Sequence, residues 1–140
     1  MKKLASIFLV VTIVLGTTYM PAYATEIEPR ESYVFSYYLA YTYEEENEGE
    51  IGIVFSVTCS HITSIIGASS IEIYRSNGTH VVTIEGTVEN GLLRNGGNCA
   101  GTYIFQGESG VSYYAAVRFY GVADGITDTR VVVTNSTKAP

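Results

Sequence analysis

The most regular hydrophobic pattern in the chain lies in Gly110–Tyr120, GVSYYAAVRFY. Apolar or aromatic residues occupy every second position from Val111 to Phe119, and the positions between them carry more polar side chains. This alternation is typical of a β-strand with one buried face, because successive side chains of a strand point to opposite sides. We therefore predict a central strand here, with Tyr113 on its inward face.

The same alternation recurs in several other segments, which are bounded by glycine, asparagine or acidic residues. Ile51–Ser60 carries its apolar residues and Cys59 on one face, which predicts that this cysteine points into the core. Asn77-Gly78 predicts a tight hairpin, and Asp124-Gly125 predicts a second one. The predicted strands are Ser32–Tyr43, Ile51–Ser60, Ser69–Arg75, Thr79–Glu85, Asn98–Gln106, Gly110–Tyr120 and Ile126–Asn135.

For the first and the last of these strands, the hydrophobic side chains indicate which face points into the core. In Ser32–Tyr43, aromatic residues dominate the phase of Phe35, and Tyr38 falls on the opposite, more polar phase. In the final strand, Val131 and Val133 are expected to face inward. We therefore expect Tyr38 on the solvent side of its sheet.

About seven short strands with frequent turn signals and no amphipathic helix predict an all-β protein. The spacing favours an antiparallel β-sandwich of immunoglobulin-like or fibronectin type III-like character, and a small closed barrel is the alternative. Tyr113 suits the tyrosine corner of such sandwiches, in which the hydroxyl bonds to an upstream backbone group. The sandwich domain is expected over residues 32–135, followed by a C-terminal tail, residues 136–140.

Residues 1–24 have the organisation of a secretory signal peptide. Two lysines form a basic start, Leu4–Leu15 forms an apolar run, and Ala22-Tyr23-Ala24 is a small-residue cleavage site. The apolar run is too short for a membrane-spanning anchor. We expect cleavage after Ala24, a polar lead-in over residues 25–31, and a secreted, extracellular protein with no membrane attachment.

After this predicted cleavage the chain retains six basic and fourteen acidic residues, a net charge of −8. Nucleic acids and anionic membranes attract clustered lysine and arginine, so we expect neither as a partner. Part of the acidity lies in Glu44–Glu50, EEENEGE, which we interpret as a solvated turn. Calcium binding by this turn is left open, because its carboxylates lie close together but lack the alternating pattern of a calcium loop.

Cys59 and Cys99 both fall on inward phases of a chain expected to be exported, which predicts a disulfide between them. The alternative is a nucleophilic Cys59 activated by His61, but an inward-facing thiol with a bonding partner is poorly suited to catalysis. Asp124 is assigned to a turn and Asp128 to an outward strand position. Neither histidine has metal-ligand spacing. We therefore expect no enzymatic activity, no metal and no cofactor.

Aromatic residues offer the main potential for binding. Ten tyrosines and no tryptophan remain after the predicted cleavage. Four tyrosines are expected on polar strand phases, where they could contact a protein or a glycan, or could stabilise cross-strand pairs. These candidates are Tyr38, Tyr74, Tyr114 and Tyr120.

Three ordered strings of residues resemble a family of small, uncharacterised secreted proteins of Gram-positive, clostridial-type bacteria. The strings are Ile66–Gly78 (IGASSIEIYRSNG), Gly110–Gly121 (GVSYYAAVRFYG) and Gly125–Asn135 (GITDTRVVVTN). The resemblance implies a signal peptide followed by one β-domain, and it implies no active site. The cysteine pair is not among the shared features.

These observations predict a monomeric, secreted, non-catalytic recognition or adhesion-type module whose partner is an extracellular protein or glycan. The alternative is a secreted inhibitor that inserts a loop such as Gly86–Asn98 into the site of its target. A small hydrolase is a more distant alternative, because no reactive group of residues is found in the sequence.

Overall fold

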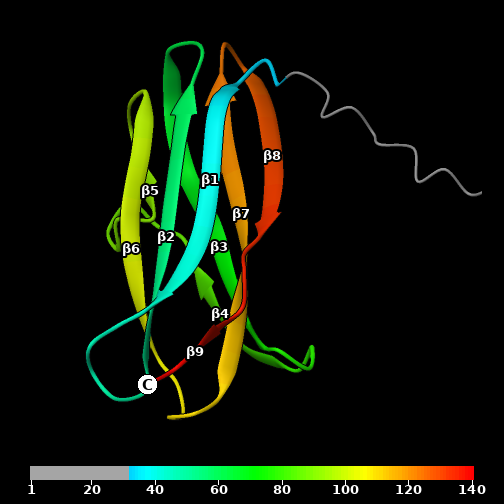
Figure 1. Ribbon diagram of the computed structural model, residues 1–140. Helices are drawn as coiled ribbons and strands as arrows, with labels where there is room; N and C mark the ends of the chain where they lie inside the picture. Colours follow the sequence, from blue (N-terminus) through cyan, green and yellow to red (C-terminus); the bar gives the residue numbers. More distant parts are fainter. Residues whose placement is uncertain (1–31) are drawn as a thin grey trace, which may run out of the picture. The chain divides into compact units, whose positions relative to one another are not determined.

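The structure, a computed structural model, describes residues 32–140. The predicted signal peptide and lead-in, residues 1–31, lie outside the described residues. Regular structure in residues 32–140 consists of β-strands (Figure 1), and no helix there is long and apolar enough to cross a membrane. The strands are β1 (Phe35–Glu44), β2 (Glu50–Cys59), β3 (Thr63–Arg75), β4 (His80–Glu85), β5 (Leu93–Arg94), β6 (Asn98–Gln106), β7 (Ser112–Ala123), β8 (Ile126–Val133) and β9 (Thr137–Lys138).

The strands form two antiparallel sheets. The three-stranded sheet has the order β1-β2-β6, and the larger sheet has the order β4-β3-β7-β8, with β5 paired to β3 and β9 paired to β7. Both sheets contribute to one hydrophobic core, with Ile53 and Phe55 from β2 and Val117 and Phe119 from β7. This arrangement confirms the predicted all-β, antiparallel, sandwich-like fold.

The strand predicted from the clearest alternation is the centre of the larger sheet. On β7, the side chains of Tyr113, Val117 and Phe119 are buried, as predicted. β3 pairs with β7 along almost its whole length, and it begins at Thr63, six residues before the predicted start. The hairpin at Asp124-Gly125 is also confirmed, and both of its central residues have positive φ, +52° and +74°.

The turn between β6 and β7 is fixed by Tyr113. Its hydroxyl accepts a hydrogen bond of 2.9 Å from the backbone N–H of Glu108. The Phe105 ring packs edge-on against the Tyr113 ring, with centroids 5.1 Å apart. The predicted bond from this tyrosine to an upstream backbone group is therefore confirmed.

β1 presents the opposite face to the core from the one expected. Tyr38 and Thr42 lie on the buried side, whereas the side chains of Tyr37 and Tyr41 are 52% and 42% exposed. The cause is a β-bulge between Phe35 and Tyr37, which inserts an extra residue and reverses the alternation beyond it. The prediction that Tyr38 lies on the solvent side is therefore wrong.

β8 also differs from the prediction. Val131 and Val133 are exposed, and Val132 between them packs against the core. Val132 pairs with Val117 of β7, and directly paired residues share one face of a sheet. Because Val117 is fully buried, Val132 faces inward and its two neighbours face solvent.

The segment predicted as a C-terminal tail is part of the fold. Thr137–Lys138 pairs with the start of β7, and Ala139 is buried. The carbonyl of Pro140 accepts a hydrogen bond of 2.8 Å from the N–H of Gly49, in the turn between β1 and β2. A strand of two residues has too short an alternation to be predicted from sequence.

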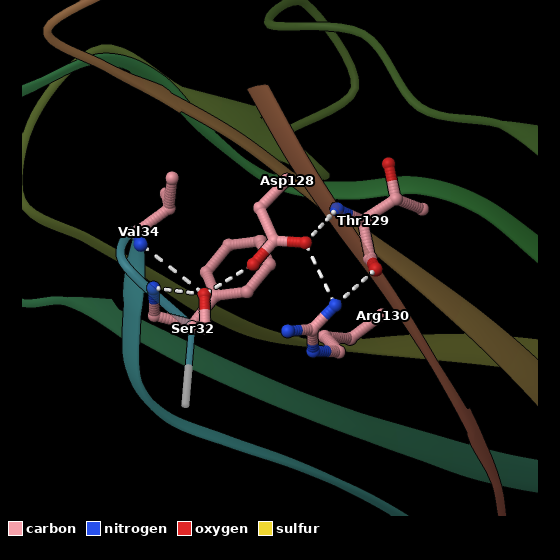
Figure 2. A network of polar contacts seen from close by, with 6 residues as sticks. Ser32, Val34, Asp128, Thr129 and Arg130 are labelled. Atoms are coloured by element: carbon pink, nitrogen blue, oxygen red, sulfur yellow. Dashed lines mark hydrogen bonds and ion pairs between the residues drawn. The ribbon is translucent and has the colours of Figure 1, made fainter. Parts of the chain in front are cut away.

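A network of polar contacts joins the start of β1 to β8 (Figure 2). The Ser32 hydroxyl donates to the carboxylate of Asp128 and accepts a hydrogen bond of 2.8 Å from the N–H of Phe35. The other carboxylate oxygen of Asp128 accepts bonds of 2.8 Å from the N–H of Thr129 and from the guanidinium of Arg130. Asp128 is thus a half-buried structural residue, and its predicted outward position is wrong.

Asn135 holds the other end of β1. Its side-chain oxygen accepts a hydrogen bond of 3.0 Å from the N–H of Thr42, and its side-chain nitrogen donates one of 3.0 Å to the Thr42 carbonyl. The Thr42 hydroxyl donates to the backbone carbonyl of Asn135 at 2.9 Å. The amide therefore pairs with the edge of β1 as a neighbouring strand would.

Candidate functional site

The four tyrosines predicted as a binding face do not form one surface. Tyr38 packs inside the sandwich, with its ring centroid 6.1 Å from that of Phe35 and 6.0 Å from that of Phe119. Tyr74, Tyr114 and Tyr120 lie on the outer side of the larger sheet, where they are half-buried. Tyr38 is therefore removed from the candidate binding residues.

Tyr74 and Tyr114 form a stacked pair. They are directly paired between β3 and β7, and their ring planes are 12° apart. The Tyr74 hydroxyl donates a hydrogen bond of 2.8 Å to the Glu72 carboxylate, which raises the pKa of this tyrosine. His80 packs edge-on against the Tyr74 ring at 5.3 Å. The contacts of these rings are with each other and with their neighbours, which agrees with the structural interpretation of a cross-strand pair.

A different surface carries the exposed aromatic residues. The outer side of the three-stranded sheet, here called the β1-β2-β6 face, exposes Tyr37, Tyr41 and Ile104 by 42–52% and Leu39 by 39%. Glu50, at the start of β2, is the charged residue of this face, and the other polar members are neutral hydroxyls and amides. The face comprises Tyr37, Leu39, Tyr41 and Tyr43 on β1, Glu50, Gly52, Val54, Ser56 and Thr58 on β2, and Asn98, Ala100, Thr102, Ile104 and Gln106 on β6.

Tyr43 lies flat on this face. It pairs directly with Gly52, and a Cβ atom added to Gly52 would collide with the Tyr43 ring, so the ring covers the glycine backbone. The Tyr43 hydroxyl donates a hydrogen bond to the carboxylate of Glu45. That bond raises the pKa of Tyr43. The ring is thus held from below by the glycine and at its tip by the carboxylate.

Sequence reasoning missed this surface because it assigned Tyr37 and Tyr41 to the phase of Phe35. A bulge cannot be predicted where the alternation of hydrophobic and polar residues is regular both before and after it. The available signal was Gly52, since a glycine inside a strand often marks the close approach of another group.

The sandwich is open on the side where β4 and β6 form the edges of their sheets. A groove of about 540 Å³ lies there, lined by Val81 and Val82 of β4 and by aromatic and apolar residues of β6. Arg75 and Glu108 also line it and form an ion pair of 3.1 Å. The opposite side of the three-stranded sheet is held to the larger one by the hydrogen bonds of β1 described above.

The predicted disulfide is not present, and Cys59 and Cys99 are both free thiols. Cys99 pairs with Val57, and the N–H of Cys59 bonds to the Gly97 carbonyl at 3.0 Å, so the cysteines are diagonal neighbours on adjacent strands. Diagonal positions are about 7–8 Å apart, beyond the distance that a disulfide spans without backbone movement. The Cys59 thiol instead donates to the Gly97 carbonyl at 2.9 Å.

Cys59 and His61 do not form a nucleophile–base pair. The His61 ring stacks on Tyr33 with centroids 4.1 Å apart, and its Nδ1 is 2.9 Å from the Tyr33 carbonyl. The Tyr33 hydroxyl donates to Asp124 at 2.8 Å, which raises the pKa of that tyrosine. These contacts fasten the first residues of the described chain to the β2–β3 and β7–β8 connections.

The acidic turn and the loop proposed for an inhibitor both make contacts within the domain. Over residues 32–140, no group of three or more histidine, cysteine, aspartate or glutamate side chains is placed to hold a metal ion. In the acidic turn, the Asn47 side chain donates to Glu50 at 2.8 Å. The loop proposed for an inhibitor packs onto the domain, because Leu92 is buried and Leu93 pairs with Gly67 of β3.

Comparison with known proteins gives little further information. No family model matches the chain, and no curated protein matches it. Among solved structures, a family 76 glycoside hydrolase from a bovine Bacteroides thetaiotaomicron strain is similar over 75% of this chain, with 20% sequence identity and a TM-score of 0.39. The match covers 20% of that protein, and at this TM-score it supports no conclusion on fold or activity.

Proposed function

We propose that this chain is a secreted, non-catalytic recognition module that binds an extracellular partner through the β1-β2-β6 face. The observation that carries this proposal is the exposure of Tyr37 and Tyr41 on a surface whose charged side chain, Glu50, lies at its far end, beyond Tyr43 and Gly52. Tyrosine supplies a large apolar contact area with a polar tip, and it is enriched among residues that dominate binding energy. Binding there requires little removal of water from charged groups, which is otherwise costly.

The same proposal includes an immunoglobulin-like or fibronectin type III-like fold. The separation into a three-stranded sheet and a four-strand path supports it. The hydrogen bond between the Tyr113 hydroxyl and the Glu108 backbone also supports it, because the corresponding bond is a recurrent feature of these sandwiches.

Export is supported by the sequence of residues 1–24, which combines a basic start, an apolar run and a small-residue cleavage site. The acidic net charge of the remaining chain favours a partner other than nucleic acid or an anionic membrane.

A pull-down against the wall fraction of the producing cell and against host mucus glycoproteins tests the proposal. Tyr37→Ala and Tyr41→Ala should each reduce retention at least fivefold with an unchanged melting temperature. Tyr120→Ala, on the outer side of the larger sheet, is the matched control and should retain binding. Failure of the wild-type protein to bind either material, or loss of binding only in the Tyr120 variant, would contradict the proposal.

A further inference from the structure

The part of the β1-β2-β6 face around Tyr43 has a geometry of its own. The ring lies across the sheet, with one side against the backbone of Gly52. Tyr43 is partly exposed, and the neighbouring side chains Tyr41 and Ile104 are exposed on the same side of the sheet. An aromatic ring that covers a glycine across two strands stabilises the sheet, and it also leaves a flat ring surface available.

This ring is fixed before any ligand arrives. The hydrogen bond from its hydroxyl to Glu45 and the contact with Gly52 restrict rotation of the side chain. A preorganised ring loses little conformational freedom on binding, so more of the contact energy appears as affinity.

The charges around the Tyr43 ring disfavour an anionic ligand. The turn that follows β1, Glu44–Glu50, carries five glutamates and no basic residue, and one of these, Glu45, touches Tyr43. An anionic ligand would be repelled there, because like charges at short range raise the free energy of the complex. Apart from Glu50 at its end, the face presents neutral hydrogen-bonding groups, such as the hydroxyls of Ser56 and Thr102.

We propose that Tyr43, supported by Gly52, is a stacking platform for a neutral hexopyranose unit of a polysaccharide. A pyranose ring has an apolar side of C–H groups that packs on the face of an aromatic ring, and a rim of hydroxyls that bonds to neutral polar side chains. Both kinds of group meet at this position of the sheet. The inference rests on the proposed function and names the ligand class of the same surface.

The test uses protein recovered from expression of the full chain and three immobilised neutral polysaccharides built of hexopyranose units: glucomannan, galactomannan and hydroxyethylcellulose. Polygalacturonate serves as the acidic probe. Biolayer interferometry should detect saturable binding to at least one neutral polysaccharide and none to polygalacturonate. Binding to polygalacturonate alone, or to none of the four, would overturn the inference, whereas the proposed function is judged separately by retention on wall or mucus material.

Two variants locate the platform. Gly52→Ala keeps every aromatic ring and displaces the Tyr43 ring from the sheet, and Tyr43→Leu keeps an apolar cover over the glycine without a ring face. Each should weaken binding to the neutral polysaccharide at least tenfold. Tyr120→Ala should change it less than twofold.

Circular dichroism establishes that the variants are folded, and Tyr43→Leu carries the test if Gly52→Ala does not fold. Unchanged affinity in Tyr43→Leu would overturn the assignment. A second copy of this chain is the competing occupant of the face. Self-association in analytical ultracentrifugation that Tyr43→Leu abolishes would identify that occupant and overturn the glycan inference.

Discussion

Tyr74 of β3 and Tyr114 of β7 lie directly opposite each other, with stacked rings 5.3 Å apart. Such aromatic pairs contribute about 0.5–1.5 kcal/mol beyond the area that they bury. Tyr114→Ala should therefore lower the free energy of unfolding, as measured by urea denaturation, by at least that amount. Tyr120→Ala removes a tyrosine from the same strand and face without breaking this pair, and it should cost less. Equal losses in the two variants would contradict a structural role for the stack.

The side-chain amide of Asn135 makes the hydrogen bonds to the edge of β1 that a neighbouring strand would otherwise make. Asn135→Ala leaves the N–H and carbonyl of Thr42 without their side-chain partners, and Thr42 is 5% exposed. Leaving such groups unpaired costs about 1–3 kcal/mol. Thermal or urea unfolding should show a loss in this range. Asn98→Ala, at an exposed position of β6, is the control and should be nearly neutral, and similar effects of the two substitutions would argue against the pairing.

The two thiols should differ in reactivity. Burial raises the pKa of the Cys99 thiol, an effect that the nearby Arg94 partly opposes, whereas Cys59 is half-exposed. The thiolate is the reactive form, so Cys99 should react with a thiol reagent such as DTNB only when the protein unfolds. Cys59→Ser should remove the fast phase of labelling and Cys99→Ser the slow one. An oxidised pair that releases no thiol on unfolding would instead support the disulfide expected from the sequence.

Alkaline pH should lower the free energy of unfolding, because three tyrosine–carboxylate hydrogen bonds are lost. The donors of these bonds are Tyr33, Tyr43 and Tyr74. The hydrogen bond to a carboxylate raises the pKa of each tyrosine above its usual value of about 10. Each pair therefore contributes its full stability below about pH 10, and loses it as the pH rises through the raised pKa, because a tyrosinate cannot donate the bond. The free energy of unfolding measured from pH 8 to 12 should fall accordingly. A variant with all three tyrosines changed to phenylalanine should fall less steeply, and identical slopes would count against this account.

Alternation in the sequence predicted the inward side of those strands whose two phases differ in polarity. On β2 and β7 one phase is apolar and the other largely polar, so the inward side of Phe55 or Val117 followed from alternation alone. β1 and β8 carry large apolar residues on both phases. Their orientation is decided by a bulge at Phe35 and by pairing with Val117, and both are tertiary features.

The candidate site depends on that bulge, which is why it was not predicted. The bulge moves Tyr37 and Tyr41 to the outside and Tyr38 to the inside, so an error of one residue in phase exchanges a surface tyrosine for a core one. The position of Tyr43 over Gly52 could not be inferred without the β1–β2 register.

The described chain enters and leaves the domain at opposite ends of β1 (Figure 1). Ser32 is fastened to Asp128 near the β7–β8 turn, and Pro140 is fastened to Gly49 in the turn after β1. Domains of this kind fused in series through these two points would therefore line up lengthwise along their strands. In such a tandem protein each copy would keep its β1-β2-β6 face uncovered, and the copies could engage one long polymer together with the gain in avidity that multivalency brings.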